Sequence, residues 1–156
     1  MKKGISPLVG HTIYIAIAIT ALGMMLVSVS QVKENTEDAS AINQMNLYSD
    51  RILSSVSKLY SFSNQLEYEP SSGEEMILMQ LKPSVPRMIA GNKYQISLSS
   101  VLKTSMVTSF GKSVEVEREL PMTIGFDGES SGPVVLKLIR YNDGEIKDKI
   151  VVDQSG

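Results

Sequence analysis

The distribution of charged residues divides the chain into an apolar N-terminal segment and a polar remainder. No Lys, Arg, Asp or Glu occurs from Gly4 to Val32, whereas the residues after Val32 mix polar and apolar types in ordinary proportions. A helix needs about 20 apolar residues to cross a bilayer, and the 19 residues of His11–Val29 approach that length before their apolar flanks are counted. The pattern therefore predicts a transmembrane or assembly helix over residues 5–32.

This apolar segment has three possible roles: a secretory signal that is removed, a permanent anchor, or a helix kept after a short leader is cut off. A secretory signal has an apolar region of only ~7–15 residues followed by small residues at the cut site. Here the run is longer, and no Ala-x-Ala follows it. Lys2 and Lys3 precede the segment, whereas Lys33 and Glu34 cancel behind it. We expect a retained single-pass helix in the cell membrane, with its N-terminus in the cytoplasm and the rest of the chain outside.

Small and capping residues organise this predicted helix. Ser6 suits an N-cap and Pro7 a first helical position. Thr12, Ala16 and Thr20 recur every four residues, which predicts a face that another helix can approach closely. The alternative is that these residues only reflect the usual composition of membrane helices.

A second pattern continues the helix into water. The apolar positions Ile42, Met45, Ile52, Val56, Leu59 and Leu66 recur with a period near 3.5, and no helix breaker precedes Glu69-Pro70. This spacing predicts an amphipathic helix over residues 33–68. Its apolar stripe either packs on the chain's own domain or forms a coiled coil. Ser49 and Ser63 lie within the stripe and disfavour the coiled coil.

The remaining residues, 69–156, follow the two-residue period of β-strands. Strands are predicted over Met76–Leu81, Tyr94–Val101 and around Val114–Glu117. Asn142-Asp143-Gly144 separates two further apolar runs, Val134–Tyr141 and Ile146–Val152, and Asp-Gly favours the tight turn of a β-hairpin. The predicted fold is α+β: a long N-terminal helix, transmembrane and then amphipathic, packed on five to seven antiparallel strands in a sheet or sandwich.

Composition argues against several functional classes. The chain has 15 basic and 17 acidic residues, one His and no Cys, so it has neither the basic cluster typical of nucleic-acid binding nor a thiol for metal or disulfide chemistry. Ser55-Val56-Ser57-Lys58 matches the Ser-x-x-Lys acylase signature, but the companion motifs are missing. Glu115, Glu117 and Glu119 are expected to be solvated rather than to bind a cation. We predict no enzymatic activity, no cofactor and no metal.

The sequence Lys2-Lys3-Gly4-Ile5-Ser6-Pro7-Leu8-Val9-Gly10, followed by a retained apolar helix, resembles the class III signal peptide of archaeal type IV pilins. The segment from Val85 to Tyr94 is also similar to archaeal secreted pilin-like domains. The resemblance implies that a prepilin-type peptidase cuts between Gly4 and Ile5, which makes residues 1–4 a leader. Bacterial pilins carry a glutamate five residues after the cut; here that position is Val9.

The resemblance also implies a function. Before the cut the protein rests in membrane lipid, and afterwards the helix packs against copies of itself or other pilin-like subunits, with the β-rich domain outside. The expected function is a major, minor or accessory subunit of a cell-surface filament of the type IV pilus kind. Two alternatives remain: an uncleaved single-pass protein that presents an extracellular β-sandwich to a cell-envelope partner, and a secreted domain that loses its whole N-terminus.

Overall fold

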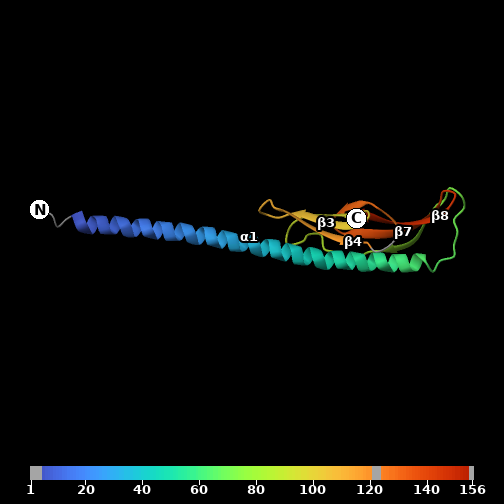
Figure 1. Ribbon diagram of the computed structural model, residues 1–156, viewed down its shortest axis with the longest axis horizontal. Helices are drawn as coiled ribbons and strands as arrows, with labels where there is room; N and C mark the ends of the chain where they lie inside the picture. The colour runs from blue at the N-terminus through green and yellow to red at the C-terminus, as the bar shows by residue number, and fades with distance from the viewer. Residues whose placement is uncertain (1–4, 121–123, 155–156) are drawn as a thin grey trace. The chain divides into compact units, whose positions relative to one another are not determined.

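A computed structural model describes residues 5–120 and 124–154 of the chain. One helix, α1 (Ile5–Ser63), precedes a β-rich region (Figure 1). The strands are β1 (Glu75–Leu81), β2 (Tyr94–Leu98), β3 (Val101–Val107), β4 (Ser113–Glu119), β5 (Gly125–Asp127), β6 (Glu129–Ser131), β7 (Val134–Asn142) and β8 (Ile146–Gln154). The predicted α+β class, with a long N-terminal helix followed by a β-rich region, is confirmed.

The chain forms two compact units that meet within α1, one ending at Glu37 and one beginning at Asp38. The helix is continuous through Thr36, whose hydroxyl donates to the carbonyl of Val32 at 2.7 Å, so this position is not the cap of a new helix. At its other end α1 stops at Ser63, five residues before the predicted limit at 68. The second unit holds the hydrophobic core.

The strands form two four-stranded sheets, with the orders β1-β7-β8-β5 and β4-β3-β2-β6. All pairings among the described strands are antiparallel except that of β5 with β8, which is parallel. The described residues hold eight strands, one more than the expected range of about five to seven, and the sheets are predominantly antiparallel as predicted, with the parallel pairing of β5 and β8 as the exception. The predicted Tyr94–Val101 strand is also divided, because Ser99 and Ser100 turn the chain and Val101 begins β3.

The amphipathic half of α1 packs on the β-strands through an apolar stripe. Its buried apolar members are Ala41, Met45, Ile52, Val56 and Leu59, and they share one cluster with the inward-facing residues of both sheets. Ser49 belongs to the same face, and its hydroxyl pairs with that of Thr104 on β3 at 2.9 Å. Of the two interpretations of the stripe, packing on the chain's own domain is correct.

Two residues of the predicted stripe lie elsewhere. Ile42 is 41% exposed, and its neighbour Ala41 is fully buried in its place. Leu66 lies beyond the end of α1 and is only half-buried. The buried face thus includes two small residues, Ala41 and Ser49, beside the strands. A search for large apolar residues does not find such positions.

Gly128 links the two sheets, because it is the single residue between β5 of one sheet and β6 of the other. Its φ of 115° lies in the region that favours glycine. A Cβ placed there would collide with the backbone of Val152 on β8. Its carbonyl also accepts from the amide of Leu98 at 3.0 Å. The crossing between sheets therefore requires a residue without a side chain.

Substitution of Gly128 tests this constraint. Gly128→Ala adds a backbone collision to the strain of a positive φ, and we expect it to lower the free energy of unfolding by about 3 kcal/mol or more. Gly144 has a similar φ of 108° and open space around it, so Gly144→Ala is the matched control, expected to cost only about 1 kcal/mol. Chemical denaturation of both variants makes the comparison. Equal losses would show that the close approach to β8 is unimportant.

Candidate functional site

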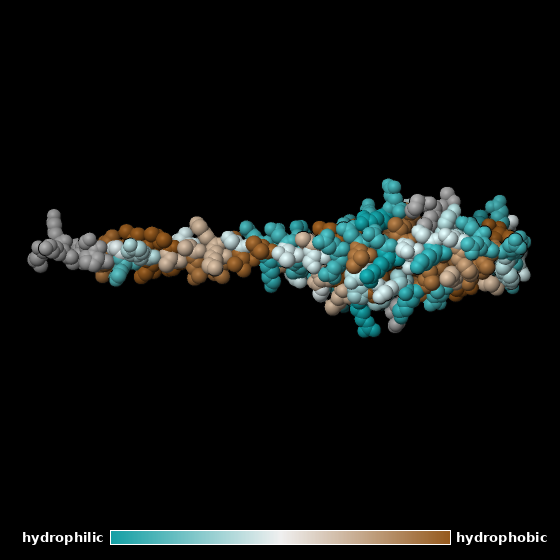
Figure 2. All heavy atoms as spheres, turned by 90° about the horizontal axis from the view of Figure 1, so that it is seen from below, coloured by the Kyte–Doolittle hydropathy of each residue, from teal (hydrophilic) through white to brown (hydrophobic). Residues whose placement is uncertain are grey.

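The first unit presents an uncovered apolar surface. From Leu8 to Val32 every residue is exposed except Gly10, which is partly buried. The large hydrophobic side chains of this segment are 48–75% exposed, and they are Leu8, Val9, Ile13, Tyr14, Ile15, Ile17, Ile19, Leu22, Met24, Met25, Leu26, Val27, Val29 and Val32. The view in Figure 2 shows mainly hydrophobic side chains along this helix and a mixed surface on the β-rich region. Because these positions point in all directions around α1, the segment has no polar face.

Three hydroxyls in this segment, those of Thr12, Thr20 and Ser28, form hydrogen bonds within the helix. Thr12 donates to the carbonyl of Leu8 at 3.0 Å, and Thr20 donates to that of Ala16 at 2.8 Å. Such bonds remove the cost of placing a hydroxyl in lipid or between apolar helices. The face formed by Thr12, Ala16 and Thr20 is therefore small, and its two hydroxyls are already hydrogen-bonded, as a close-packing face requires. Contact of this face with another helix stays a prediction. Of the predicted leader site, Gly4 lies outside the described residues and Ile5 begins α1.

This helix is long and apolar enough to cross a bilayer, and none of its apolar segment is buried by the described part of the chain. A helix that is hydrophobic all round is stable only when something other than water surrounds it. Lipid and a bundle of similar helices both satisfy that requirement. The candidate functional site is therefore this surface, Leu8–Val32, rather than a pocket.

Polar contacts hold the amphipathic half of α1 on the β-strands at three levels. Near the start of the second unit, the Nζ of Lys112 contacts the carboxylate of Asp38. In the middle, Arg118 of β4 donates to Asn46 at 2.5 Å and to Asp50 at 3.2 Å. At the end of the helix Arg140 of β7 donates to three backbone carbonyls, those of Ser63, Leu66 and Tyr68, at 2.8–2.9 Å.

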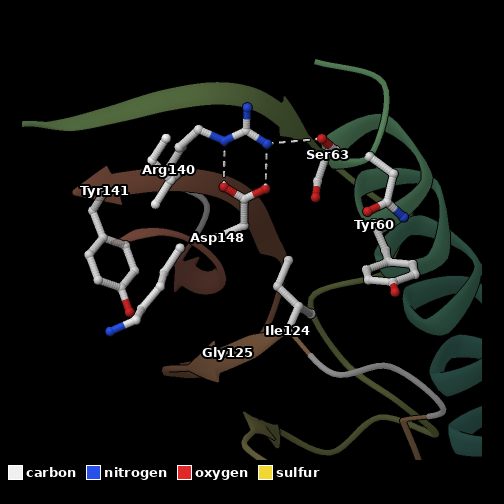
Figure 3. A pocket seen from close by; sticks show the side chains of 10 residues that line it. Tyr60, Ser63, Ile124, Gly125, Arg140, Tyr141 and Asp148 are labelled. Carbon is white, nitrogen blue, oxygen red and sulfur yellow. Dashed lines mark hydrogen bonds and ion pairs between the residues drawn. The ribbon is translucent and has the colours of Figure 1, made fainter. Parts of the chain in front are cut away.

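Arg140 and Asp148 form a buried bidentate ion pair (Figure 3). They lie opposite each other on β7 and β8, both nitrogen–oxygen distances are 2.7 Å, and their side chains are 9% and 11% exposed. Burial raises the pKa of Asp148. Hydrogen bonds from Arg140 and Ser63, together with the positive charge of Arg140, lower it by more than burial raises it, so the pKa falls below the usual Asp value. Together with the carbonyls above, this pair forms the Arg140 clamp.

The pocket beside the Arg140 clamp has a volume of ≈ 430 Å³ and is lined partly by Tyr60, Ile124 and Lys147 (Figure 3). Its buried guanidinium and carboxylate are fully engaged with each other and with backbone carbonyls. We therefore assign these charged groups a structural role in fixing the end of α1.

In the described part of the chain, the other candidate residues do not come together as a catalytic or metal-binding site. Ser55 of the Ser-x-x-Lys match donates its hydroxyl to the carbonyl of Arg51 at 3.0 Å. Glu115 and Glu117 are exposed and contact Lys103 at 2.8 and 3.6 Å. Among the described residues no group of three or more His, Cys, Asp or Glu side chains converges as a metal would require.

The Arg140 clamp was missed at the sequence level, although the chain carries a signal for it. Along β7, Arg140 follows Leu136 and Leu138 at a spacing of two residues, so it points to the same inward face. Along β8, Asp148 lies two residues before the inward-facing Ile150. Opposite charges at facing, inward positions of a predicted hairpin indicate a buried ion pair.

Comparison with protein-family models, curated proteins and solved structures gave no match.

Breaking the Arg140 clamp should loosen the end of α1. Arg140→Met removes the guanidinium and leaves Asp148 buried without its partner, which we expect to cost about 3–5 kcal/mol of unfolding free energy near pH 7. The ordinary Asp value is 3.8. Because pairing lowers the pKa of Asp148 in the folded protein, its stabilisation is complete above that value and is lost as the pH falls through the lowered pKa. The difference between variant and wild type should therefore shrink in acid.

Lys147→Met is the matched control, because the ion pairs of Lys147 with Asp143 and Glu145 of the β7–β8 turn are exposed. We expect its unfolding curve to follow that of the wild type. Urea titrations at neutral and acidic pH measure both variants. A pH-independent loss in Arg140→Met would contradict the role given to the ion pair.

Proposed function

We propose that this protein is a pilin-like structural subunit of a cell-surface filament, inserted in the membrane through Leu8–Val32 and assembled through the same surface. The observation that carries the proposal is the contrast within α1. Its second half buries its apolar stripe on the β-strands, whereas the large hydrophobic side chains of Leu8–Val32 are all exposed. A helix intended only to complete the domain core would not need this second, larger apolar surface.

The sequence at the N-terminus supports processing before assembly. Lys2 and Lys3 are the only charged residues before Lys33, and they hold that end of the helix at the cytoplasmic face. A cut between Gly4 and Ile5 removes both lysines. The remaining helix can then leave lipid for a bundle of similar helices without moving a lysine side chain through the membrane. The small residues Thr12, Ala16 and Thr20 would allow close approach in that bundle.

The β-rich unit supports a structural role on the outside of the filament. It is held on the second half of α1 by the Arg140 clamp and by further polar contacts, so it stays attached to the helix without a disulfide. Major, minor and accessory subunits all fit this arrangement. An uncleaved anchor that presents the β-rich unit to a cell-envelope partner is the second candidate, favoured by the same exposed helix when the leader is kept.

Gly4→Phe tests the processing step. A bulky side chain beside the cleaved bond should exclude the chain from the peptidase, so the full-length protein should accumulate in the membrane and be missing from filaments sheared from the cells. Leu8→Phe, an apolar exchange on the kept side of the cut, is the control and should be processed normally. Immunoblots of membrane and sheared fractions distinguish the forms. Normal filaments built from uncut Gly4→Phe protein would refute the leader assignment.

Ala16→Leu tests the packing face. If neighbouring helices approach closely at Ala16, the larger side chain overpacks the contact by about 1–3 kcal/mol and should reduce filament yield about tenfold. Ile17→Leu changes no volume at the adjacent position and should assemble normally. Both variants remain apolar, so their amounts in the membrane should match the wild type. Equal filament yields for the two variants would remove Ala16 from the interface.

A further inference from the structure

Two exposed loop groups of opposite charge lie at opposite ends of the β-rich unit. The acidic end comprises residues 64–75 and the β7–β8 turn; its acidic residues are Glu67, Glu69, Glu74, Glu75, Asp143 and Glu145. The basic loop comprises residues 82–93, with Lys82, Arg87 and Lys93 and no acidic residue. All of these charged residues lie in connections before or between strands except Glu75, which is the first residue of β1.

Hydrogen bonds fix the place of each group along α1. The basic loop lies beside residues 44–51 of α1, because the Oε1 of Gln44 accepts from the amide of Ala90 at 3.2 Å and Arg51 donates to the carbonyl of Ser84 at 3.2 Å. The acidic end follows Ser63, and its two parts are joined by the side chain of Asn142, which donates to the carbonyl of Pro70 at 3.0 Å. Figure 1 shows the connection after α1 and the β7–β8 turn together at one end of the unit.

This separation prevents the two groups from neutralising each other within one copy. From Gln44 to the end of α1 the distance along the axis is roughly 30 Å at ~1.5 Å per residue. Exposed charges are screened over a Debye length of about 8 Å at physiological ionic strength. Among the described residues, Arg87, Lys93, Glu67 and Glu74 make no ion pair. These charges are exposed and available to another molecule.

We propose that the acidic end of one copy binds the basic loop of a second copy, and that this contact sets the register of neighbouring subunits. The inference rests on the proposed function. The apolar surface Leu8–Val32 has no polar face, so by itself it favours association without fixing one axial position. Complementary charges supply that specificity. A contact between two different patches is heterologous, and it builds an open filament when its rotation does not close into a ring.

Charge reversal tests this contact in the full-length protein. Arg87→Glu/Lys93→Glu makes the basic loop acidic, and Glu67→Lys/Glu74→Lys replaces two exposed carboxylates of the acidic end with lysines. Each double variant should weaken the contact between its own copies and reduce the yield of sheared filaments about tenfold or more. Cells that produce both variants together should recover filaments, because the introduced glutamates of one then meet the introduced lysines of the other. The chain with all four substitutions keeps the wild-type net charge and should also recover.

Lys58→Glu is the control for a reversal outside both groups, because Lys58 is exposed on α1 and makes no ion pair among the described residues. Thermal unfolding of each variant shows that the β-rich unit still folds. Recovery in the mixture and in the fourfold variant supports the contact. Full assembly of either double variant, or loss that neither combination restores, overturns it. Absence of filaments in the wild type would instead refute the proposed function.

Discussion

The whole arrangement depends on an apolar helical surface that its own chain does not cover. Water cannot surround Leu8–Val32 without a large free-energy cost, since most of the exposed side chains are hydrophobic and the hydroxyls of Thr12, Thr20 and Ser28 are hydrogen-bonded to the helix backbone. Lipid satisfies this surface in a membrane, and other helices satisfy it in an assembly. Because both environments are apolar, moving between them exchanges one set of dispersion contacts for another. The proposed function depends on that equivalence, because it assigns one helix the role of an anchor first and of a filament core afterwards.

The second half of α1 faces the opposite requirement, because it must stay joined to a domain that remains in water. Its apolar stripe supplies the area, and the polar contacts supply the position. The pair between Ser49 and Thr104 lies inside the core, while Lys112 and the Arg140 clamp hold the two ends of the packed segment. A purely apolar stripe can slide by one turn against a sheet. Buried polar partners make such a shift costly, because each displaced group would lose its hydrogen bonds without regaining water.

The periodicity of the sequence was sufficient for the helix and the long strands. The apolar run before Lys33, the stripe through Met45 and Leu59, and the hairpin around Asp143-Gly144 each follow one clear period, and each appears in the structure. Shorter and tertiary features were not accessible in this way. Strands β5 and β6 have three residues each, too few for a period to be recognised, and the parallel pairing of β5 with β8 depends on the crossing at Gly128. To predict the Arg140 clamp, the inward-facing positions of two strands have to be considered together. The apolar surface of α1 does not by itself show whether lipid or another helix covers it.

The most direct measurement is the intact mass of the protein purified from its native membrane and from material sheared off the cell surface. The account predicts a chain that lacks Met1 to Gly4 and begins at Ile5 in the sheared fraction, with any full-length form confined to the membrane. A single species that keeps Lys2 and Lys3 everywhere would contradict it. Those lysines would then be a permanent cytoplasmic anchor, and the exposed helix would serve only to hold the β-rich domain at the membrane.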